Sequence, residues 1–316
     1  MDTILKVLNS NDFVSGESLA KKLGVTRTAI WKNIKNLEKK GYKIEAVKNR
    51  GYKLISKPDT PFPEEIKQGL QTKIIGKKII YCDTVDSTNT YAKKLVKENI
   101  EEGTVVIAEV QTKGRGRKSR KWFSPVGGLW FSIILYPNTP PYHSMLVTMA
   151  ASASIAHAVK KTIGIQPVIK WPNDLLINNK KICGVLTELD AEIDKLNYCI
   201  IGIGINVNNK INDEIKNTAT SLKIENDSIP VSRVELLKQI LHEFDKNYYQ
   251  LKHGNVKYIR DQWFLFSDII GKKIQVSSQE NVAFEGTVLD VDDMGCLIVK
   301  TSKDIVRIVT GDVIYL

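Results

Sequence analysis

The strongest chemical signal in the sequence is a basic segment at residues 111–122, which reads QTKGRGRKSRKW. Five of the seven residues from 115 to 121 are Lys or Arg. Gly114 and Gly116 allow the backbone to approach a ligand closely, and the cations can neutralise phosphate or carboxylate oxygens through charge-assisted hydrogen bonds. The segment lacks the GK[ST] sequence of a Walker loop. Taken alone, it is consistent with an anion-binding loop, a nucleic-acid patch or a disordered basic tip.

A second signal is an apolar strand, YCIIGIGIN, that ends at Asn206. Side chains alternate along a strand, so every second residue from Ile200 to Asn206 shares one face. Gly202 and Gly204 lie on that face and leave a flat trough in which a planar group could lie. A dinucleotide-binding fingerprint is excluded, because position 207 is Val and the segment ends in Asn-Val-Asn-Asn without opening a helix.

Three shorter segments add polar groups. Residues 86–89, DSTN, open a predicted helix, where their hydroxyls and amides either hold a polar ligand group or only cap the helix. The segments KWPND at 170–174 and KKICG at 180–184 add cations, an acid and another close-approach glycine. GxSxG and HExxH motifs are absent, and the four histidines form no pair, which disfavours hydrolases and metalloenzymes.

Alternating apolar strands and long helices must position these segments between Glu64 and Ser267. The patterns predict strands at 79–82, 104–110, 129–135, 174–178, 182–189 and 197–207, and helices at 87–98, 144–163 and 232–251. Ser232 and Glu235 form a capping box for the last helix. The short turn at 178–180 implies antiparallel pairing, so we expect an α+β fold with a mixed or antiparallel sheet.

The N-terminal residues predict a separate module. Apolar spacing indicates a short helix around Ile4 and a second helix that ends at Gly24, and Thr26 then caps a third. A hairpin at 43–54 with Arg50 at its tip follows, which makes the module a winged helix-turn-helix. Its candidate DNA-binding residues are Arg27, Thr28, Trp31, Lys32, Lys35 and Arg50.

The distribution of charge supports DNA binding by this module. The net charge of the chain is +11, and residues 1–57 hold thirteen Lys/Arg against five Asp/Glu, whereas the rest of the chain holds 33 against 30. A basic field concentrated in a small module is typical of a protein that binds the phosphate backbone. A generic solvated three-helix domain, RNA binding and protein docking are the alternatives.

Prolines at positions 58, 61 and 63 indicate a linker after this module. We therefore predict three domains, at 1–60, 64–268 and 269–316. The last domain contains short predicted strands, a pattern that suits a small SH3-like β-barrel. These strands are at 273–277, 283–291, 295–301 and 305–309.

The apolar stretches and the cysteines limit the class of protein further. No stretch reaches the roughly 18 consecutive apolar residues that a membrane span requires, so we expect a soluble, cytoplasmic protein without a membrane partner. The four cysteines form no CxxC pair, which indicates reduced, buried thiols and no protein-held metal. They are Cys82, Cys183, Cys199 and Cys296.

Together the motifs resemble those of the bacterial biotin protein ligase and biotin operon repressor family. The matching segments are DSTN at 86–89, Gln111, GRGRKSRKW at 114–122, GGLW at 127–130, KWPND at 170–174, KKICGVL at 180–186, GIGINV at 202–207 and ATSL at 219–222. The resemblance implies a central domain like that of class II synthetases, flanked by the winged helix and barrel of repressor-type members. It also implies two half-reactions. Biotin and ATP form biotinyl-5′-adenylate and pyrophosphate, and a lysine of a biotin carboxyl carrier domain then attacks the adenylate.

The same resemblance implies roles for individual residues. Arg115, Arg117 and Lys181, with Mg²⁺ as an activator, would offset the repulsion between the biotin carboxylate and the α-phosphate of ATP. No covalent enzyme nucleophile is required. The residues implied to hold biotin are Ser87, Thr88, Asn89, Gln111, Arg115, Gly116, Arg117, Lys181, Gly202 and Gly204.

Trp122 and Asn206 are implied to close over the adenylate, because an acyl-adenylate must be kept from water until the lysine arrives. Asp174 orients or deprotonates that lysine, or only packs beside Lys170. The adenine-covering loop of the family corresponds to residues 208–222. The implied partners are the carrier domain, operator DNA and, with the adenylate bound, a second copy of the chain. Two rival functions are a regulator that binds a small ligand without catalysis, and a lipoate ligase of related fold.

Overall fold

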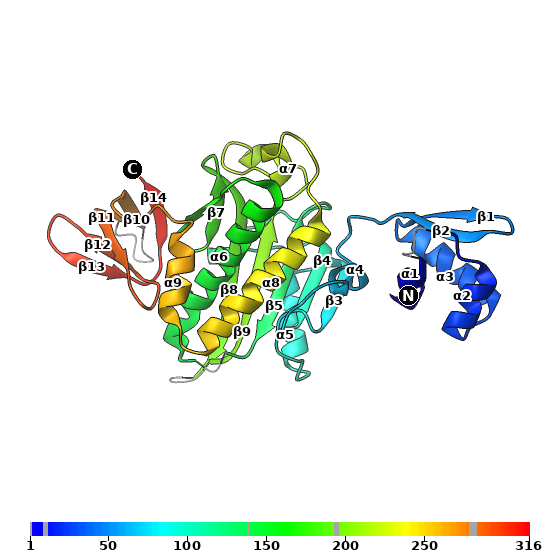
Figure 1. The fold of residues 1–316 in the computed structure, drawn as a ribbon. Helices are drawn as coiled ribbons and strands as arrows, with labels where there is room; N and C mark the ends of the chain where they lie inside the picture. Colours follow the sequence, from blue (N-terminus) through cyan, green and yellow to red (C-terminus); the bar gives the residue numbers. More distant parts are fainter. Residues whose placement is uncertain (1, 9–11, 138, 193–195, 278–282) are drawn as a thin grey trace. The chain divides into compact units, whose positions relative to one another are not determined.

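The computed structural model describes residues 2–8, 12–137, 139–192, 196–277 and 283–316. These residues fall into two compact units, one that ends at Gln68 and one that begins at Gly69 (Figure 1). The predicted division of the second unit at 268/269 is finer than this and stays a prediction. Among the described residues, no helix is both long enough and apolar enough to cross a membrane.

The first unit is the predicted winged helix-turn-helix. Its elements are α1 (Asp2–Leu8), α2 (Gly16–Leu23), α3 (Arg27–Lys39), β1 (Lys43–Val47), β2 (Gly51–Ser56) and α4 (Pro63–Lys67). Ser15 and Thr26 cap α2 and α3 by accepting hydrogen bonds from backbone N–H groups. Gly24 ends α2 in the left-handed conformation, with a φ of 63°. The apolar face of α3 around Ile34 is buried, as its spacing predicts.

The predicted hairpin at 43–54 is present as the antiparallel pair β1–β2. Gly51, which begins β2, has a φ of 102°, and a Cβ atom at this position would lie 2.1 Å from the carbonyl oxygen of Val14. Val14 and Tyr52 exchange two backbone hydrogen bonds, each with an N···O distance of 2.9 Å. The wing is therefore tied to the segment that precedes α2, and only glycine fits at the crossing point.

Helix α4 extends the first unit beyond the predicted linker. Pro63 is its first residue, where a missing N–H group breaks no helical hydrogen bond. The buried carboxylate of Glu65 accepts hydrogen bonds from Tyr42 Oη at 3.0 Å and Lys57 Nζ at 2.8 Å. These contacts explain why the compact unit ends at Gln68, several residues after the predicted boundary.

The second unit is built on a seven-stranded sheet with the order β3-β4-β5-β9-β8-β7-β6. The strands are β3 (Ile79–Val85), β4 (Val105–Gln111), β5 (Leu129–Leu135), β6 (Val168–Lys170), β7 (Asp174–Ile177), β8 (Lys180–Ala191) and β9 (Leu196–Ile205). Strands β3 and β4 run parallel, and the other neighbouring pairs run antiparallel. Asn178 and Asn179 form the turn between β7 and β8 with φ values of 49° and 61°. The predicted α+β class with a mixed sheet is confirmed.

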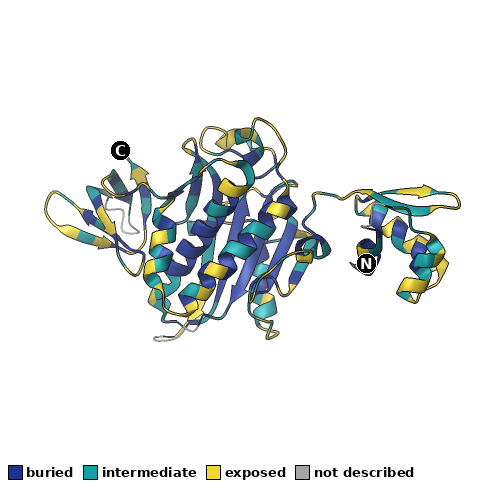
Figure 2. Ribbon diagram, in the orientation of Figure 1, coloured by how far each residue is buried: buried dark blue, intermediate teal, exposed yellow. Residues whose placement is uncertain are grey.

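Two long helices, α6 (Ser144–Ile163) and α8 (Arg233–Lys252), lie side by side in front of the sheet in Figure 1. Asn247 of α8 joins them by donating a hydrogen bond to Ser154 Oγ of α6 at 2.8 Å. Figure 2 shows that the strands behind them are buried. Ser232 caps α8 by accepting a hydrogen bond from the Glu235 N–H group, as the capping box predicts.

Helix α5 (Thr88–Val96) packs on the other face of the sheet. Its Ala92 lies in one apolar cluster with Ile200 of β9. Helix α6 instead contacts the sheet through Thr148 and Thr187, and Thr187 is the register partner of Ile201. Consecutive residues of a strand point to opposite faces, so α5 lies on the face of β9 that also carries the two glycines of the GIG sequence.

The C-terminal strands form a five-stranded antiparallel sheet with the order β13-β12-β11-β10-β14. The strands are β10 (Lys273–Ser277), β11 (Ala283–Val291), β12 (Leu297–Lys300), β13 (Ile305–Ile308) and β14 (Asp312–Tyr315). Helix α9 (Val256–Phe264) precedes this sheet and contacts it through an ion pair between Arg260 and Asp290 at 3.3 Å. The four predicted C-terminal strands are present, and β14 is an additional one.

The elements that sequence patterns missed are short. They are α4, α7 (Leu222–Glu225), α9, β6, β14 and the 3₁₀ turns η1 (Arg117–Ser119), η2 (Pro141–His143) and η3 (Asp213–Ile215). Most of them offer too few residues to establish a period. Helix α9 is longer, but Ile259 and Trp263 are its only buried residues, so its apolar stripe is narrow.

The carboxylate of Asp245 in α8 fixes the entry segment of the second unit, because it accepts hydrogen bonds from the N–H groups of residues 73, 74 and 75, each at 2.8 Å. Asp245→Ala should lower the free energy of unfolding of this unit by about 3 kcal/mol, because it leaves three N–H groups, one of them buried, without their acceptor. Urea unfolding followed by tryptophan fluorescence measures this, because four of the five tryptophans lie after residue 69. The exposed Asp261→Ala is the control, with an expected change below about 0.5 kcal/mol. Equal losses in both variants would contradict the prediction.

Candidate active site

A cavity of about 560 Å³ opens on the glycine face of the central sheet. It is lined by the basic segment, the start of α5, strands β7 to β9 and the segment that follows β9. The cavity brings together all thirteen residues predicted for small-molecule chemistry. These are Ser87, Thr88, Asn89, Gln111, Arg115, Gly116, Arg117, Trp122, Asp174, Lys181, Gly202, Gly204 and Asn206.

Hydrogen bonds fix the amide of Gln111 at one end of the cavity. Its Oε1 atom accepts from the Thr88 N–H group at 2.8 Å and from Thr88 Oγ1 at 3.1 Å. Its Nε2 atom donates to Ser124 Oγ at 2.9 Å. Ser87 occupies the N-cap position of α5 but makes no side-chain capping hydrogen bond. Helix capping therefore does not account for the Ser87 hydroxyl.

Asn89 is held against the glycine face by a second set of bonds. Its Oδ1 atom accepts from Ser132 Oγ at 2.6 Å, and its Nδ2 atom donates to Glu188 Oε2 at 2.7 Å. A Cβ atom at Gly202 would lie 2.3 Å from Asn89 Oδ1. The first glycine of the trough is therefore needed for an amide of the protein itself, and not only for a ligand.

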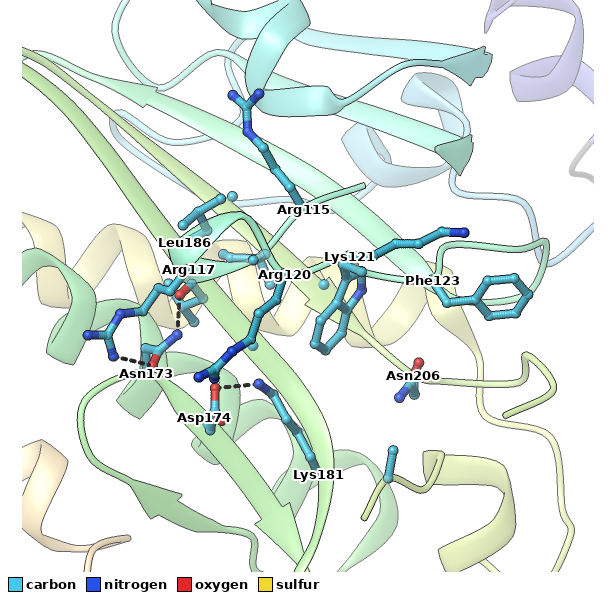
Figure 3. A pocket seen from close by; sticks show the side chains of 18 of the residues that line it. Arg115, Arg117, Arg120, Lys121, Phe123, Asn173, Asp174, Lys181, Leu186 and Asn206 are labelled. Carbon is cyan, nitrogen blue, oxygen red and sulfur yellow. Dashed lines mark hydrogen bonds and ion pairs between the residues drawn. The ribbon is translucent and has the colours of Figure 1, made fainter. Parts of the chain in front are cut away.

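Glu188 forms ion pairs with two cations at the end of the cavity where Asn89 lies. Its carboxylate contacts Lys93 Nζ at 3.0 Å and Arg115 Nη2 at 3.1 Å. Burial would raise the pKa of Glu188, but the hydrogen bonds from Lys93 and Asn89 and the charge of Arg115 hold that pKa below its usual value. Figure 3 shows that the Arg115 side chain points away from Lys181. The Arg115 guanidinium is thus paired with Glu188, while Arg115 is also one of the residues that line the cavity.

The indole ring of Trp122 lies in the trough over the second glycine. A Cβ atom at Gly204 would lie 2.5 Å from Trp122 Nε1, and one at Gly184 would lie 3.1 Å from the ring. The ring meets Trp130 edge to face, with centroids 6.5 Å apart. Trp122 Nε1 is buried, and no hydrogen-bond acceptor reaches it among the described residues. A planar group does lie in the predicted trough, and it is a side chain of the basic loop.

Lys181 and Asp174 form an ion pair on the opposite wall, with 2.6 Å between Nζ and Oδ1 (Figure 3). They come from neighbouring strands, β8 and β7, across the hairpin turn. The Lys181 ammonium also lies 5.2 Å from the centroid of the Trp122 ring, within range of a cation–π interaction. The amine therefore lies between the Asp174 carboxylate and the Trp122 ring, next to the trough.

Arg117 is the most enclosed cation of the basic loop. Its Nη1 atom donates to Asn173 Oδ1 at 3.2 Å, and its Nη2 atom donates to Thr310 Oγ1 at 2.9 Å. Burial lowers the pKa of the guanidinium, and the nearby carboxylates Asp312 and Asp174 oppose that effect. Sequence analysis placed Arg117 in the site, but Asn173 and Thr310, which hold it there, were not predicted.

The segment after β9 forms the remaining wall, where the sequence resemblance placed a covering loop. Lys181 anchors its far end through two backbone hydrogen bonds, from its own N–H group to Thr218 O at 2.8 Å and from the Thr220 N–H group to Lys181 O at 3.0 Å. Asn209 closes the near end by donating to Asn206 Oδ1 at 3.1 Å. The segment thus lines the cavity with both of its ends fixed.

Metal-ligating groups are sparse. Within the described ranges, no cluster of three or more His, Cys, Asp or Glu residues could hold a metal ion. Asp174 is a carboxylate on the cavity wall, and Asn206 supplies an amide on the opposite side. Such a site suits a hydrated magnesium ion that arrives on phosphate oxygens better than it suits a resident metal.

In the first unit, the six residues predicted to bind DNA are all exposed. Trp31 on α3 has 53% of its surface exposed, although it is a large aromatic residue. Arg50 stacks over the ring of Phe13 at 4.3 Å, which fixes the tip of the wing near α2. The outer face of α3 and the wing tip are both basic, which is the arrangement by which such modules bind duplex DNA.

A ligand cavity on a mixed sheet, in one chain with a winged helix-turn-helix, defines a class of protein that combines small-molecule chemistry with nucleic-acid binding. Three family models match the chain. The biotin/lipoate A/B protein ligase family matches residues 81–206, an HTH domain matches 1–53, and the biotin protein ligase C-terminal domain matches 269–315.

Whole-chain comparisons agree with these matches. The chain is 40% identical to the bifunctional ligase/repressor BirA of Bacillus subtilis over 96% of its own length and 94% of the relative. It is 26% identical to the corresponding Escherichia coli protein over 94% and 91% of the two chains. The solved biotin protein ligase from Aquifex aeolicus in complex with biotin and ATP covers 76% of this chain, with 30% identity and a TM-score of 0.65. The chain belongs to the biotin/lipoate A/B protein ligase family, among its bifunctional ligase/repressors.

The Asn89–Gly202 contact yields a stability test. Gly202→Ala should destabilise the second unit by about 1–3 kcal/mol, because the new methyl group overlaps an amide that Ser132 and Glu188 hold in place. In an Asn89→Ala background the amide is gone, so the cost of the same change should fall by about 1 kcal/mol or more. Thermal unfolding of the four proteins in this double-mutant cycle measures the difference. Strictly additive effects would show that the contact does not exist in solution.

Proposed function

We propose that this chain is an ATP-dependent biotin ligase that also represses transcription by binding DNA. The observation that carries the ligase function is the cavity itself. It places the charged Lys181 amine and the Arg117 guanidinium above a glycine trough, with the Gln111–Thr88 amide and hydroxyl groups at its far end. That combination suits a ligand with a polar ring at one end and a carboxylate at the other.

In the first half-reaction, a carboxylate oxygen of biotin attacks the α-phosphorus of ATP. A new O–P bond forms, the bond to the β-phosphate oxygen breaks, and pyrophosphate leaves. The reactants are anions that repel one another, so fixed cations lower the barrier. Lys181 and Arg117 supply this charge from positions that both neighbour Asp174, and Arg115 adds its charge from the Glu188 end.

The residues proposed to bind biotin divide into two groups. Ser87, Thr88, Asn89 and Gln111 offer hydroxyl and amide groups to the ureido ring, and the orientation of Gln111 is set before any ligand arrives. The backbone from Arg115 to Arg117, with Gly116 at its centre, together with Lys181, holds the carboxylate. Gly202 and Gly204 contribute to the pocket floor by making room for the Asn89 amide and the Trp122 ring.

Magnesium is proposed to enter with ATP, coordinated mainly by its phosphates and by water. It would neutralise part of the triphosphate charge. Asp174 is the carboxylate best placed to hold it from the protein side, since it already lies against Lys181.

We assign protection of the intermediate to two walls of the cavity, the basic loop and the segment that follows β9. Trp122 and Asn206 border the trough from the basic loop and from the end of β9, respectively, and residues 208–222 cover the adenine. An acyl-adenylate hydrolyses in water, so a closed site preserves it until the acceptor lysine arrives.

In the second half-reaction, the ε-amine of a lysine in a biotin carboxyl carrier domain attacks the acyl carbonyl carbon. An amide forms and AMP leaves, while the amine gives up a proton. Asp174 is proposed to orient that amine or to accept its proton. Its carboxylate lies 2.6 Å from Lys181 Nζ on the cavity wall, within reach of a ligand in the cavity.

The decisive experiment is exchange of labelled pyrophosphate into ATP with either biotin or lipoate present. Only the cognate acid supports exchange, so biotin-dependent exchange supports the proposal. Exchange with lipoate alone would make the chain a lipoate ligase. Binding of biotin without any exchange would make it a non-catalytic regulator.

Lys181→Ala should fold normally and lower the single-turnover rate of adenylate formation by about 100-fold or more, as expected when one preorganised charge is removed. Lys180→Ala is the matched control, because its side chain points to the other face of β8 and is outside the cavity. Near-normal adenylation by the Lys181 variant would remove this residue from the catalytic machinery.

The repressor function predicts coupling between the two sites. Biotinyl-adenylate should strengthen DNA binding by about tenfold, because it favours a homodimer that matches paired half-sites in the operator. Gel-shift titrations of DNA from a biotin-gene control region, with adenylate, biotin or acceptor protein added, measure this. Lys32→Ala should weaken every complex without affecting pyrophosphate exchange. Equal DNA affinity under all three conditions would leave the ligase and eliminate the biotin-sensing repressor.

A further inference from the structure

The last turn of the chain reaches back to the basic loop. Asp312 begins β14, some 190 residues after the loop in sequence, and its carboxylate lies on the border of the cavity. Lys118 Nζ contacts Asp312 Oδ2 at 3.1 Å, and Arg120 Nη2 contacts the same oxygen. The two cations at the tip of the loop therefore share one carboxylate.

The Asp312 carboxylate is suited to a permanent contact. Its side chain is 28% exposed, so water competes with its partners only in part. Burial alone would raise the pKa of Asp312, but the hydrogen bonds from Lys118 and Arg120 keep it below its usual value. The group is therefore ionised throughout the neutral range, and both contacts are charge-assisted.

The backbone at the tip needs such a contact. Lys118 and Ser119 have φ values of 53° and 58°, in the left-handed region that residues with a Cβ atom rarely adopt. Two consecutive residues in that region persist only when their surroundings hold them. The loop itself supplies two backbone hydrogen bonds, Gly116 N to Arg120 O at 2.7 Å and Arg120 N to Arg117 O at 3.2 Å. The contacts with Asp312 come from outside the loop.

The neighbours of Asp312 bind the same loop. Thr310 Oγ1 and the Gly311 carbonyl oxygen accept hydrogen bonds from Arg117 Nη2 at 2.9 Å and 3.3 Å. Trp122, which lies in the trough, follows Arg120 by two residues. The tip that Asp312 holds is thus continuous with the two side chains that border the proposed intermediate.

We propose that Asp312 is a positioning residue that fastens the tip of the basic loop to the last strand and so keeps Arg117 and Trp122 over the bound acyl-adenylate. The fastening itself is a property of the free protein. The part that concerns the adenylate rests on the proposed ligase function. Asp312 acts through the loop and takes no part in bond making.

Three variants test the proposal. Asp312→Asn removes the charge and keeps the shape of the side chain, and Asp312→Glu restores the charge. Asp304→Asn is the matched control, because Asp304 is an exposed acid of the same small sheet whose only hydrogen bonds among the described residues use its backbone. Two partly exposed ion pairs are lost in the first variant, so we expect about a tenfold effect on loop opening.

Limited trypsin digestion of the free, full-length protein measures loop opening directly, because trypsin cleaves after Lys and Arg and residues 115–121 contain five of them. Mass spectrometry should show cleavage within 115–121 about tenfold faster in Asp312→Asn, with near-parental rates in Asp312→Glu and Asp304→Asn and at sites elsewhere. Equal cleavage of the loop in the parent and Asp312→Asn would overturn the proposal. Faster cleavage everywhere would also overturn it, because Asp312 would then stabilise the fold as a whole.

The second part of the proposal, retention of the adenylate, is tested by measuring the release of labelled biotinyl-adenylate into a chase of unlabelled biotin and ATP. Release should be about tenfold faster from Asp312→Asn than from the parent, with near-parental release from Asp312→Glu and Asp304→Asn. An open loop with unchanged retention would overturn the link to the intermediate. If the parent protein makes no adenylate, the proposed ligase function fails, and the digestion result still decides whether Asp312 fastens the loop.

Discussion

Mutual repulsion among five cations in seven residues is the constraint on which this site depends. A loop of that composition would spread into solvent unless each charge met a partner. Four of the five charges have acceptors: Glu188 for Arg115, Asn173 and the β13–β14 turn for Arg117, and Asp312 for both Lys118 and Arg120. Without these contacts, such a loop would bind any polyanion. The contacts shape it around one cavity, which is also lined by the Lys181–Asp174 ion pair.

The glycines of β9 leave space on the sheet for side chains from other segments. The sequence predicted a flat trough correctly, but a trough can be filled by a ligand or by the protein. Asn89 lies over Gly202 and Trp122 lies over Gly204, so the trough is where two separate segments meet the sheet. This packing explains how residues 89, 122 and 204, which are far apart in sequence, act as one surface.

Local patterns predicted most elements of the fold, because periodicity and capping residues are encoded within short windows. The candidate site residues came from motifs and from the family resemblance that those motifs carry, and they line one cavity. The partners of those residues were not predictable in the same way. Ser132, Glu188 and Asp312 are ordinary strand residues in sequence, and they join the site only through the register of β5 and β8 and the return of β14. Helix α4 was not predicted for a similar reason, since it joins the first unit through the contacts of Glu65 with Tyr42 and Lys57.

The backbone of Lys181 anchors the segment that follows β9. Its N–H and carbonyl groups both pair with the segment at 218–220, and Asn209 fixes the other end of the covering segment to Asn206. The residues between these anchors can therefore change in number or in kind without displacing the amine. A change confined to this stretch would alter the lining of the cavity, while the Lys181–Asp174 pair would keep its place.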